Sequence, residues 1–418
     1  MRSPRWAFVA VSSLLLSGTL TAAGAPAKGK PAPPKEVVVN LAQSSNAFGF
    51  DLYQRLRTDP GNLVFSPPSI TTVLTMAWGG AEGETAAQMR KVLHLEGTAG
   101  DVMAASGRLA RSLQDPSRPL LFRIATQIFA QKTYKLVPAY VEKTRAALGA
   151  PIETLDFKTA PDRARVHINQ WIESKTAHRI QNLIPPDGVS SYSRLVLVNA
   201  IYFLGDWSSP FEPWATRPAP FFLTATQKKN VPTMNQENQF LVGQQDGVTA
   251  VSLPYKGGEM SMVLLVPDRV DGLAAVEGSL DAKKLAALMS AMKVEVIELS
   301  LPKFEINPGG SLLLGGDLRA LGMPLAFDRE RADLTGIANP PRRDERLFLS
   351  EVFHKAFVRV DEKGTEAAAA TAGGVPGGMG AGPGPRQIKV DRPFLFLIRD
   401  NASGLVVFLG RVSDPSRR

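Results

Sequence analysis

Cysteine is absent from this chain of 418 residues, and histidine occurs only four times, at positions 94, 167, 178 and 354. The lack of cysteine excludes disulfide bonds, a thiol nucleophile and cysteine-ligated metal sites. The histidines form neither an HExxH motif nor a pair at helical spacing, so we expect no metal site. An exported protein without disulfides is held by packing alone, as in many exported bacterial proteins, and this favours a bacterial source.

Motifs of catalysis and nucleotide binding are also missing. The chain contains no GxSxG elbow, because its nearest approach, Gly309 to Leu313, lacks the closing glycine. The glycine-rich tract from Gly373 to Gly384 contains neither GxGxxG nor GxxxxGK[ST]. We therefore expect a protein that is not an enzyme and that uses no cofactor.

Long apolar runs are confined to the beginning of the chain. Arg2 and Arg5 precede an apolar segment at 6–20, and small residues follow at 22–25. This order is typical of a signal peptide, so we expect residues 1–25 to be removed, with a cut after Ala23 as an equal alternative, and the protein to be secreted or periplasmic. Residues 26–36, rich in Pro, Ala and Lys, are predicted to be a linker. No later run reaches the length of a membrane span, so no membrane association is expected.

The net charge of +9 does not indicate a nucleic-acid partner. The segment before Val37 carries +4 of this charge and leaves +5 for the rest, where no run of five basic residues occurs. Two interpretations of the arginines at 108, 111, 118 and 123 stay open: a weak polyanion-binding face, or a solvated surface. We expect a monomer.

Hydrophobic periodicity changes along the chain. Helical spacing of apolar residues covers 37–58, 66–77 and 160–184, and Ser66 or Pro67 is placed to begin the second helix. Strand-like runs follow at 194–203, 249–254, 261–266, 294–301, 347–360, 393–399 and 404–412. The pattern predicts an α+β fold, in which helices of the N-terminal half pack on large mixed β-sheets.

A long connection separates the strands that end near Val360 and begin near Pro393. Loops of this length, here about 362–392, are usually functional or disordered, and a slack tether is the simpler alternative. In an extended chain Thr365, Ala367 and Ala369 share one uncharged face, while Glu366 lies on the other. The first half of this exposed loop can therefore enter a sheet as a strand.

The loop and its flanks resemble a known family. Residues Glu362 to Thr371, EKGTEAAAAT, are similar to the hinge of inhibitory serpins, and Asp391 to Phe396, DRPFLF, resembles the C-terminal signature of that family. Further blocks match in the family's order: NLVFSPPSI at 62–70, LVNAIYF at 197–203, GDW at 205–207, LSLPKF at 299–304 and FLGRV at 408–412. The chain is identified as a member of the serpin family, with the serpin domain at 37–415.

The resemblance implies a suicide-substrate mechanism. A serine protease cleaves the loop and is acylated, after which the hinge inserts into the largest sheet as a central strand and the protease is trapped irreversibly. The hinge comprises Glu362, Gly364, Thr365, Glu366, Ala367, Ala368, Ala369 and Ala370. Family matches also place a polar cluster that controls sheet opening at Ser66, Ser69, Asn199 and His354, with Trp207 at the top of the sheet. Ordinary buried residues are a compatible interpretation of these positions.

Counting from the hinge places the reactive bond between Gly378 and Met379. A cut after Met379 or after Arg386 remains an alternative. The small apolar tip favours elastase-like or subtilisin-like proteases, or chymotrypsin-like ones if Met379 is read, with cysteine proteases as a further target class. The glycines and the proline between 373 and 378 form strands poorly, which leaves a non-inhibitory serpin, acting as a binding or carrier protein or as a plain protease substrate, as the alternative function.

Overall fold

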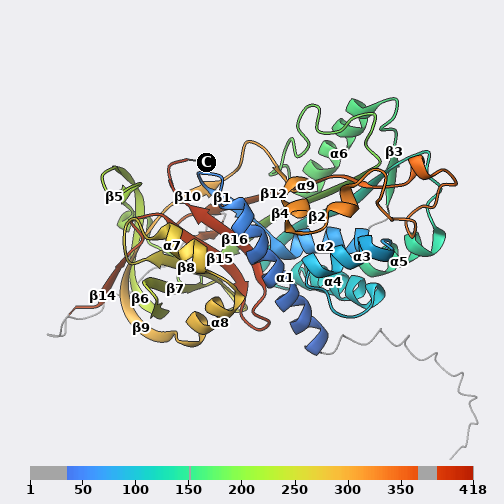
Figure 1. Ribbon diagram of the computed structural model, residues 1–418. Helices are drawn as coiled ribbons and strands as arrows, with labels where there is room; N and C mark the ends of the chain where they lie inside the picture. The colour runs from blue at the N-terminus through green and yellow to red at the C-terminus, as the bar shows by residue number, and fades with distance from the viewer. Residues whose placement is uncertain (1–34, 150–151, 366–383, 418) are drawn as a thin grey trace, which may run out of the picture. The chain divides into compact units, whose positions relative to one another are not determined.

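The computed structural model describes residues 35–149, 152–365 and 384–417 (Figure 1). The predicted signal peptide, nearly all of the predicted linker, and several site residues lie outside these ranges. Those site residues are Glu366, Ala367, Ala368, Ala369, Ala370, Gly378 and Met379. The chain from Pro34 onward forms one compact unit.

Helices dominate the first half of the described chain. They are α1 (Lys35–Leu56), α2 (Pro67–Trp78), α3 (Gly83–Val92), α4 (Ala99–Leu113), α5 (Pro138–Leu148) and α6 (Pro161–Lys175), followed later by α7 (Leu273–Ser279), α8 (Ala282–Ser290) and α9 (Gly315–Leu321). Ser66 stands at the N-cap of α2 as predicted, and proline fills the first turn, where its missing N–H costs nothing. No described helix is long and apolar enough to cross a membrane.

The described strands form two sheets. The first has the strand order β1-β16-β15-β8-β7-β6-β9-β14, with β5 paired to β6, and the second has the order β10-β12-β13-β4-β2-β3, with β11 paired to β12. The strands of the first are β1 (Leu63–Phe65), β5 (Arg217–Phe222), β6 (Lys228–Gln245), β7 (Val248–Pro254), β8 (Met260–Pro267), β9 (Lys293–Pro302), β14 (Arg386–Lys389), β15 (Phe394–Asp400) and β16 (Val406–Val412). Those of the second are β2 (Leu120–Gln131), β3 (Glu153–Leu155), β4 (Leu195–Asp206), β10 (Phe304–Ile306), β11 (Leu312–Leu313), β12 (Leu349–Val360) and β13 (Gly364–Thr365).

Helix α2 occupies the centre of the core. All twelve of its residues are buried, and it contacts β2 and β4 of one sheet and β16 of the other. A helix that is buried on every side, with mostly apolar and small hydroxyl side chains, is stable only inside such an arrangement. Figure 1 shows α3, α4 and α5 beside α2, and the strands β5 to β9 on the opposite side of the molecule. The α+β fold with helices of the N-terminal half against large mixed sheets is confirmed.

The structure corrects two predicted boundaries and adds elements that were not predicted. Helix α6 ends at Lys175 and not at 184, because the chain turns where Ala177 and His178 adopt positive φ angles of 49° and 61°. The 18-residue strand β6 was not predicted, since its sequence is largely polar and lacks a clear alternation. Helix α1 begins at Lys35, inside the predicted linker, where lysine and glutamate are good helix formers.

Candidate functional site at the seam between β4 and β12

Strands β4 and β12 lie side by side and pair in parallel, and we call the line between them the seam. Direct pairing runs from Leu195 opposite Leu349 to Tyr202 opposite Phe357. Beyond that point β13 enters the seam, where Thr365 pairs with both Val360 and Gly205. The seam is thus closed along most of its length and holds two residues of the loop at one end. A longer insertion would have to separate β4 from β12.

A chain of hydrogen bonds crosses the closed seam. His354 on β12 is fully buried and lies directly opposite Asn199 on β4. Its Nε2 accepts the backbone N–H of Ser66 at 3.1 Å, so the ring proton must lie on Nδ1, which donates to Asn199 Oδ1 at 2.7 Å. The amide of Asn199 in turn donates to Thr126 Oγ1 on β2 at 2.8 Å. These bonds join the start of α2 to three neighbouring strands.

Burial fixes the protonation state of this histidine. The apolar surroundings lower the pKa of His354 to about 3, because desolvation disfavours the imidazolium. A protonated ring would also direct an N–H toward the N–H of Ser66, where neither group can accept. His354 is therefore neutral at physiological pH and serves as both donor and acceptor.

The structure brings together three of the four residues predicted to control sheet opening. Ser66 contributes through its backbone, and Asn199 and His354 through their side chains. Ser69 is buried one turn further along α2, and the hydroxyls of both serines have no hydrogen-bond partner among the described residues. Thr126 belongs to the same chain of bonds, although no motif pointed to it. A threonine in a strand carries no pattern that singles it out.

Trp207 and Tyr255 hold the first residues of the hinge. The backbone N–H of Trp207 donates to the carbonyl of Lys363 at 2.8 Å, and its indole N–H donates to the carbonyl of Asp361 at 3.1 Å. Its ring stacks on Tyr255 with centroids 4.7 Å apart. The Tyr255 hydroxyl lies 2.7 Å from Thr365 Oγ1, and Thr365 is fully buried. Trp207, which the family match placed at the top of the sheet, contacts the chain that leads into the hinge, whereas Tyr255 was not predicted.

Glu362 is anchored outside the seam. Its carboxylate accepts hydrogen bonds from Lys303 Nζ at 2.7 and 3.0 Å and from Thr216 Oγ1 at 2.8 Å. Its carbonyl accepts the N–H of Phe211 at 2.8 Å. Partial burial alone would raise the pKa of Glu362, but the hydrogen bonds from Lys303 and Thr216 outweigh it and the pKa lies below its usual range. The carboxylate is charged and points away from the seam.

Gly364 occupies a place that no other residue fits. A Cβ atom at this position would lie 2.0 Å from the carbonyl oxygen of Gly205 on β4. The close approach lets the chain turn from Asp361 into the seam within four residues, with bonds between the backbones of Asp361 and Gly364 of 3.0 and 3.3 Å. Two short strands lie within the predicted loop: β13 begins at Gly364, near its start, and β14 begins at Arg386, near its end.

Arg386 marks the point where the loop returns. Strand β14 pairs in parallel with β9, with Arg386 opposite Ile297. The guanidinium of Arg386 contacts Glu295 Oε2 at 3.2 Å and Gln244 Oε1 at 3.1 Å. Residues 386–389, which lie inside the predicted loop at about 362–392, form a short strand in which Ile388 is buried. Cleavage after Arg386 would cut at a paired strand, which disfavours that alternative.

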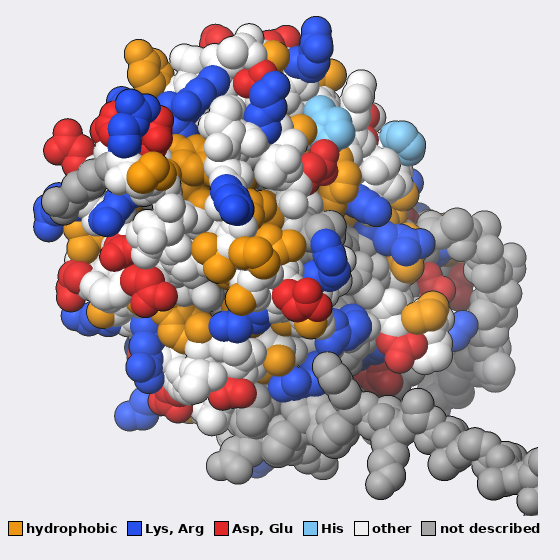
Figure 2. Space-filling model, turned by 90° about the vertical axis from the view of Figure 1, so that its right-hand side faces the viewer, with side chains coloured by type: hydrophobic (Ala, Val, Ile, Leu, Met, Phe, Trp, Pro, Cys, Tyr) orange, Lys and Arg blue, Asp and Glu red, His pale blue; other side chains and the backbone are white. Residues whose placement is uncertain are grey.

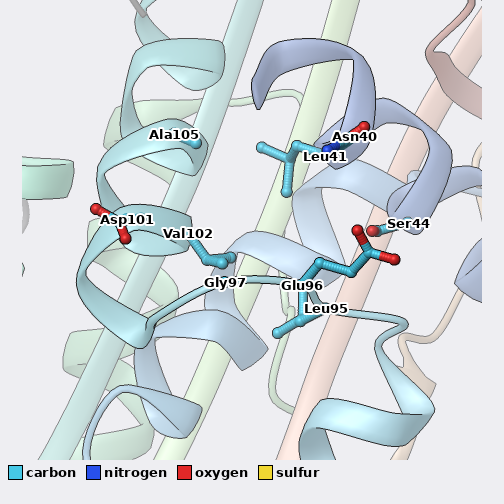
Figure 3. Close-up of a pocket in the computed structure, with 9 residues that line it drawn as sticks. All are labelled: Asn40, Leu41, Ser44, Leu95, Glu96, Gly97, Asp101, Val102 and Ala105. Atoms are coloured by element: carbon cyan, nitrogen blue, oxygen red, sulfur yellow. The ribbon is translucent and has the colours of Figure 1, made fainter. Parts of the chain in front are cut away.

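A pocket of about 340 Å³ lies between α1 and α4, away from the seam (Figure 3). Leu41, Leu95 and Val102 supply its apolar wall, and the carboxylates of Glu96 and Asp101 lie at its margins. The hydroxyl of Ser44 donates to the carbonyl of His94 at 2.6 Å and has no histidine side chain to activate it. The described residues also contain no group of three side chains able to hold a metal ion.

Comparisons with known proteins agree with this geometry. The family model described as serpin (serine protease inhibitor) matches residues 43–415. Leukocyte elastase inhibitor of Homo sapiens is 36% identical over 386 residues, covering 90% of this chain and 99% of the relative. The protein Iris of Ixodes ricinus is 37% identical and covers 88% of this chain and 97% of its own length.

Solved structures extend the likeness to the fold. Uncleaved ovalbumin superposes with a TM-score of 0.80 at 28% identity, over 90% of this chain and all of that one. Human thyroxine-binding globulin, complexed with thyroxine, superposes with a TM-score of 0.81 at 26% identity, over 91% of this chain and all of that one. The family match, the two relatives and the shared fold together establish that this chain belongs to the serpin family.

Proposed function

We propose that this protein is an irreversible inhibitor of serine proteases that acts as a suicide substrate. One observation carries the proposal. Strands β4 and β12 pair directly along most of the seam, yet Thr365 already lies between them at one end. If β4 and β12 separate, the loop can continue from Thr365 into the space between them. A strand of about ten more residues would gain backbone hydrogen bonds on both sides, each contributing about 1 kcal/mol net. Cleavage of the loop would release it to take that path.

The relatives support a target class. Several of them are named leukocyte elastase inhibitors, and elastase-type pockets accept small apolar side chains. The proposed reactive bond between Gly378 and Met379 fits such a pocket or a subtilisin-like one, and cleavage after Met379 would suit a chymotrypsin-like enzyme. The control of opening by Ser66, Asn199 and His354 is part of this proposal.

Trapping is tested with the mature protein and four proteases, elastase, subtilisin, chymotrypsin and trypsin, in separate incubations. The expected result is a covalent band that survives boiling in detergent, together with a released C-terminal peptide that begins at Met379 or Gly380. If each protease yields only cleaved product and the melting temperature does not rise, trapping is excluded for these enzymes. A carrier function, as in the name of thyroxine-binding globulin, or a plain substrate would then be the better proposal.

Export completes the proposal. The order of charges, apolar residues and small residues in 1–25 supports a cleaved signal peptide and a secreted or periplasmic protein. N-terminal sequencing of the protein recovered outside the producing cell is expected to begin at Gly24 or Pro26, whereas a sequence beginning at Met1 would contradict export by this signal. The proposed bacterial source rests on the lack of cysteine alone, and the relatives named above are animal proteins.

We also propose that the protein is a monomer and that it binds polyanions weakly. Arg111 donates to the carbonyl of Ala147, and Arg118 pairs with Glu259 at 2.6 Å, so two of the four arginines have partners within the protein. Arg123 remains exposed on β2. On the face seen in Figure 2, lysines and arginines are interspersed with acidic side chains. Such mixed charge supports weak attraction of a polyanion that salt would screen.

A further inference from the structure

A second cavity lies on the face of β12 opposite to His354. It has a volume of about 540 Å³ and is lined by the turn after α6, by β10 with the residues that follow it, and by β12. Side chains alternate along a strand, so Lys355, Phe357 and Arg359 share the face that lines this cavity, while His354 points toward α2. The cavity is separate from the polar cluster of the seam but shares the strand β12 with it.

Lys355 is the unusual member of this cavity. Lys355 as a whole is only 7% exposed. Burial lowers the pKa of its amine, because desolvation disfavours the ammonium. Within the described residues the amine donates one hydrogen bond, to the carbonyl of Gln181 at 3.1 Å, and forms no ion pair. An ammonium has three N–H donors. A nearly buried cation is thus left with donors to spare beside a polar cavity.

Further positive charge surrounds this lysine. Arg359 lies two residues along the same face, and its guanidinium forms a long ion pair with Asp361 at 3.7 Å, with no hydrogen bond between them. Arg179 brings a further positive charge from the turn after α6, where His178 also lines the cavity, whereas Glu305, opposite Arg359 on β10, is the one carboxylate among the lining residues. Positive charge exceeds negative charge in this lining, in the manner of an anion site.

The turn that covers the cavity has an uncommon backbone. Ala177, His178 and Asn182 have φ angles of 49°, 61° and 51°, in the left-handed region that residues with a Cβ seldom adopt. Such conformations persist where the surrounding structure imposes them, and they are common at ligand clamps. The turn is therefore held in one shape over the cavity, which suits a preformed site.

We propose that this cavity binds a small oxyanion of the sulfate or phosphate type, with Lys355 and Arg359 as its principal ligands. The planar guanidinium of Arg359 can present two N–H groups to adjacent oxygens, and the ammonium of Lys355 supplies the donors that the protein leaves unused. A bound anion would tie β12 to the turn after α6. Because β12 forms one side of the seam, this link would stabilise the closed sheet. The site does not depend on the proposed inhibitory function.

The test uses the full-length protein, with sodium sulfate and, separately, sodium phosphate as probes at constant ionic strength maintained with sodium chloride. Calorimetric titration is expected to show saturable binding, and the melting temperature is expected to rise with the same concentration dependence. Lys355→Met, which keeps the aliphatic length and removes the charge, is expected to weaken binding at least about 10-fold. The matched control Lys389→Met, at an exposed lysine on β14, is expected to bind as the wild type does.

Two results would overturn the proposal. One is an absence of saturation below about 10 mM anion, a concentration above which binding is too weak to be specific. The other is equal affinity in the wild type and in Lys355→Met. If Lys355→Met does not fold, Arg359→Gln provides the second variant, since its side chain is half exposed and its loss spares the core. Unchanged affinity in Arg359→Gln would likewise overturn the assignment of Arg359 as a ligand of the anion.

Discussion

Thr365→Arg is expected to convert the protein from an inhibitor into a substrate. Thr365 is fully buried in the seam and shares a hydrogen bond of 2.7 Å with Tyr255. An arginine there would bury a charge without a partner, which costs about 3 kcal/mol or more. That penalty corresponds to at least about a 100-fold loss in the fraction of protease that is trapped. The measurement is the ratio of covalent complex to cleaved product on a denaturing gel.

The control for this variant is Thr226→Arg, which places the same side chain on an exposed turn between β5 and β6. It is expected to trap as the wild type does. The cleavage rate of Thr365→Arg should stay within a few-fold of the wild type, because Thr365 is not part of the proposed reactive bond between Gly378 and Met379. Undiminished trapping by Thr365→Arg would show that the loop does not use the path that β13 begins.

His354→Ala is expected to lower the free energy of unfolding by about 3–5 kcal/mol. The substitution leaves the backbone N–H of Ser66 and the side-chain Oδ1 of Asn199 without a partner, at about 1–3 kcal/mol each, and it creates a cavity. Urea denaturation gives the change, and hydrogen exchange of β4 and β12 is expected to accelerate along the seam. His94→Ala is the control, because His94 is exposed and its contact with Asp51 contributes at most about 1 kcal/mol.

Comparison of the wild type with His354→Ala also isolates the contribution of His354 to the pH dependence of stability. The pKa of His354 is about 3 in the folded protein and near 6.5 when it is unfolded, so the neutral form is favoured by folding. Its contribution is complete above pH 6.5 and is lost as the pH falls toward 3, by about 1.4 kcal/mol per pH unit. The wild type should therefore lose stability more steeply than His354→Ala between pH 6 and pH 4. Parallel pH profiles would mean that the pKa of His354 is the same in the folded and unfolded protein, and would contradict the effect of burial on this histidine.

The parts of the fold that sequence patterns predicted are those with strong hydrophobic periodicity. The continuous apolar run of β4 is buried along nearly its whole length, as expected for a central strand. Strand β6 escaped prediction because it pairs through its backbone with β5, β7 and β9 while its side chains remain largely polar. The end of α6 depended on the turn at Ala177 and His178, where residues other than glycine adopt positive φ angles that residue type does not signal.

The site was predicted in outline and missed in its contacts. Positions of the hinge and of Asn199 and His354 followed from the family motifs, and these two side chains do meet. Tyr255 and Lys303, which hold Thr365 and Glu362, come from strand and loop positions far away in the chain. A single sequence contains no signal for such partners, because only the folded topology brings them together.

The parallel pairing of β4 with β12 has a consequence for how the chain folds. Asn199 and His354 are 155 positions apart, and contacts of that separation form slowly. The residues that follow Thr365 are synthesised directly after β12. The loop can therefore compete with β12 for pairing with β4 almost as soon as β12 itself is available. The tight turn from Asp361 to Gly364 forms locally and therefore quickly, and it leaves Thr365 at the entrance. We therefore expect the relative speed of these two events, and not only the depth of the final energy minimum, to decide which arrangement a newly made chain adopts.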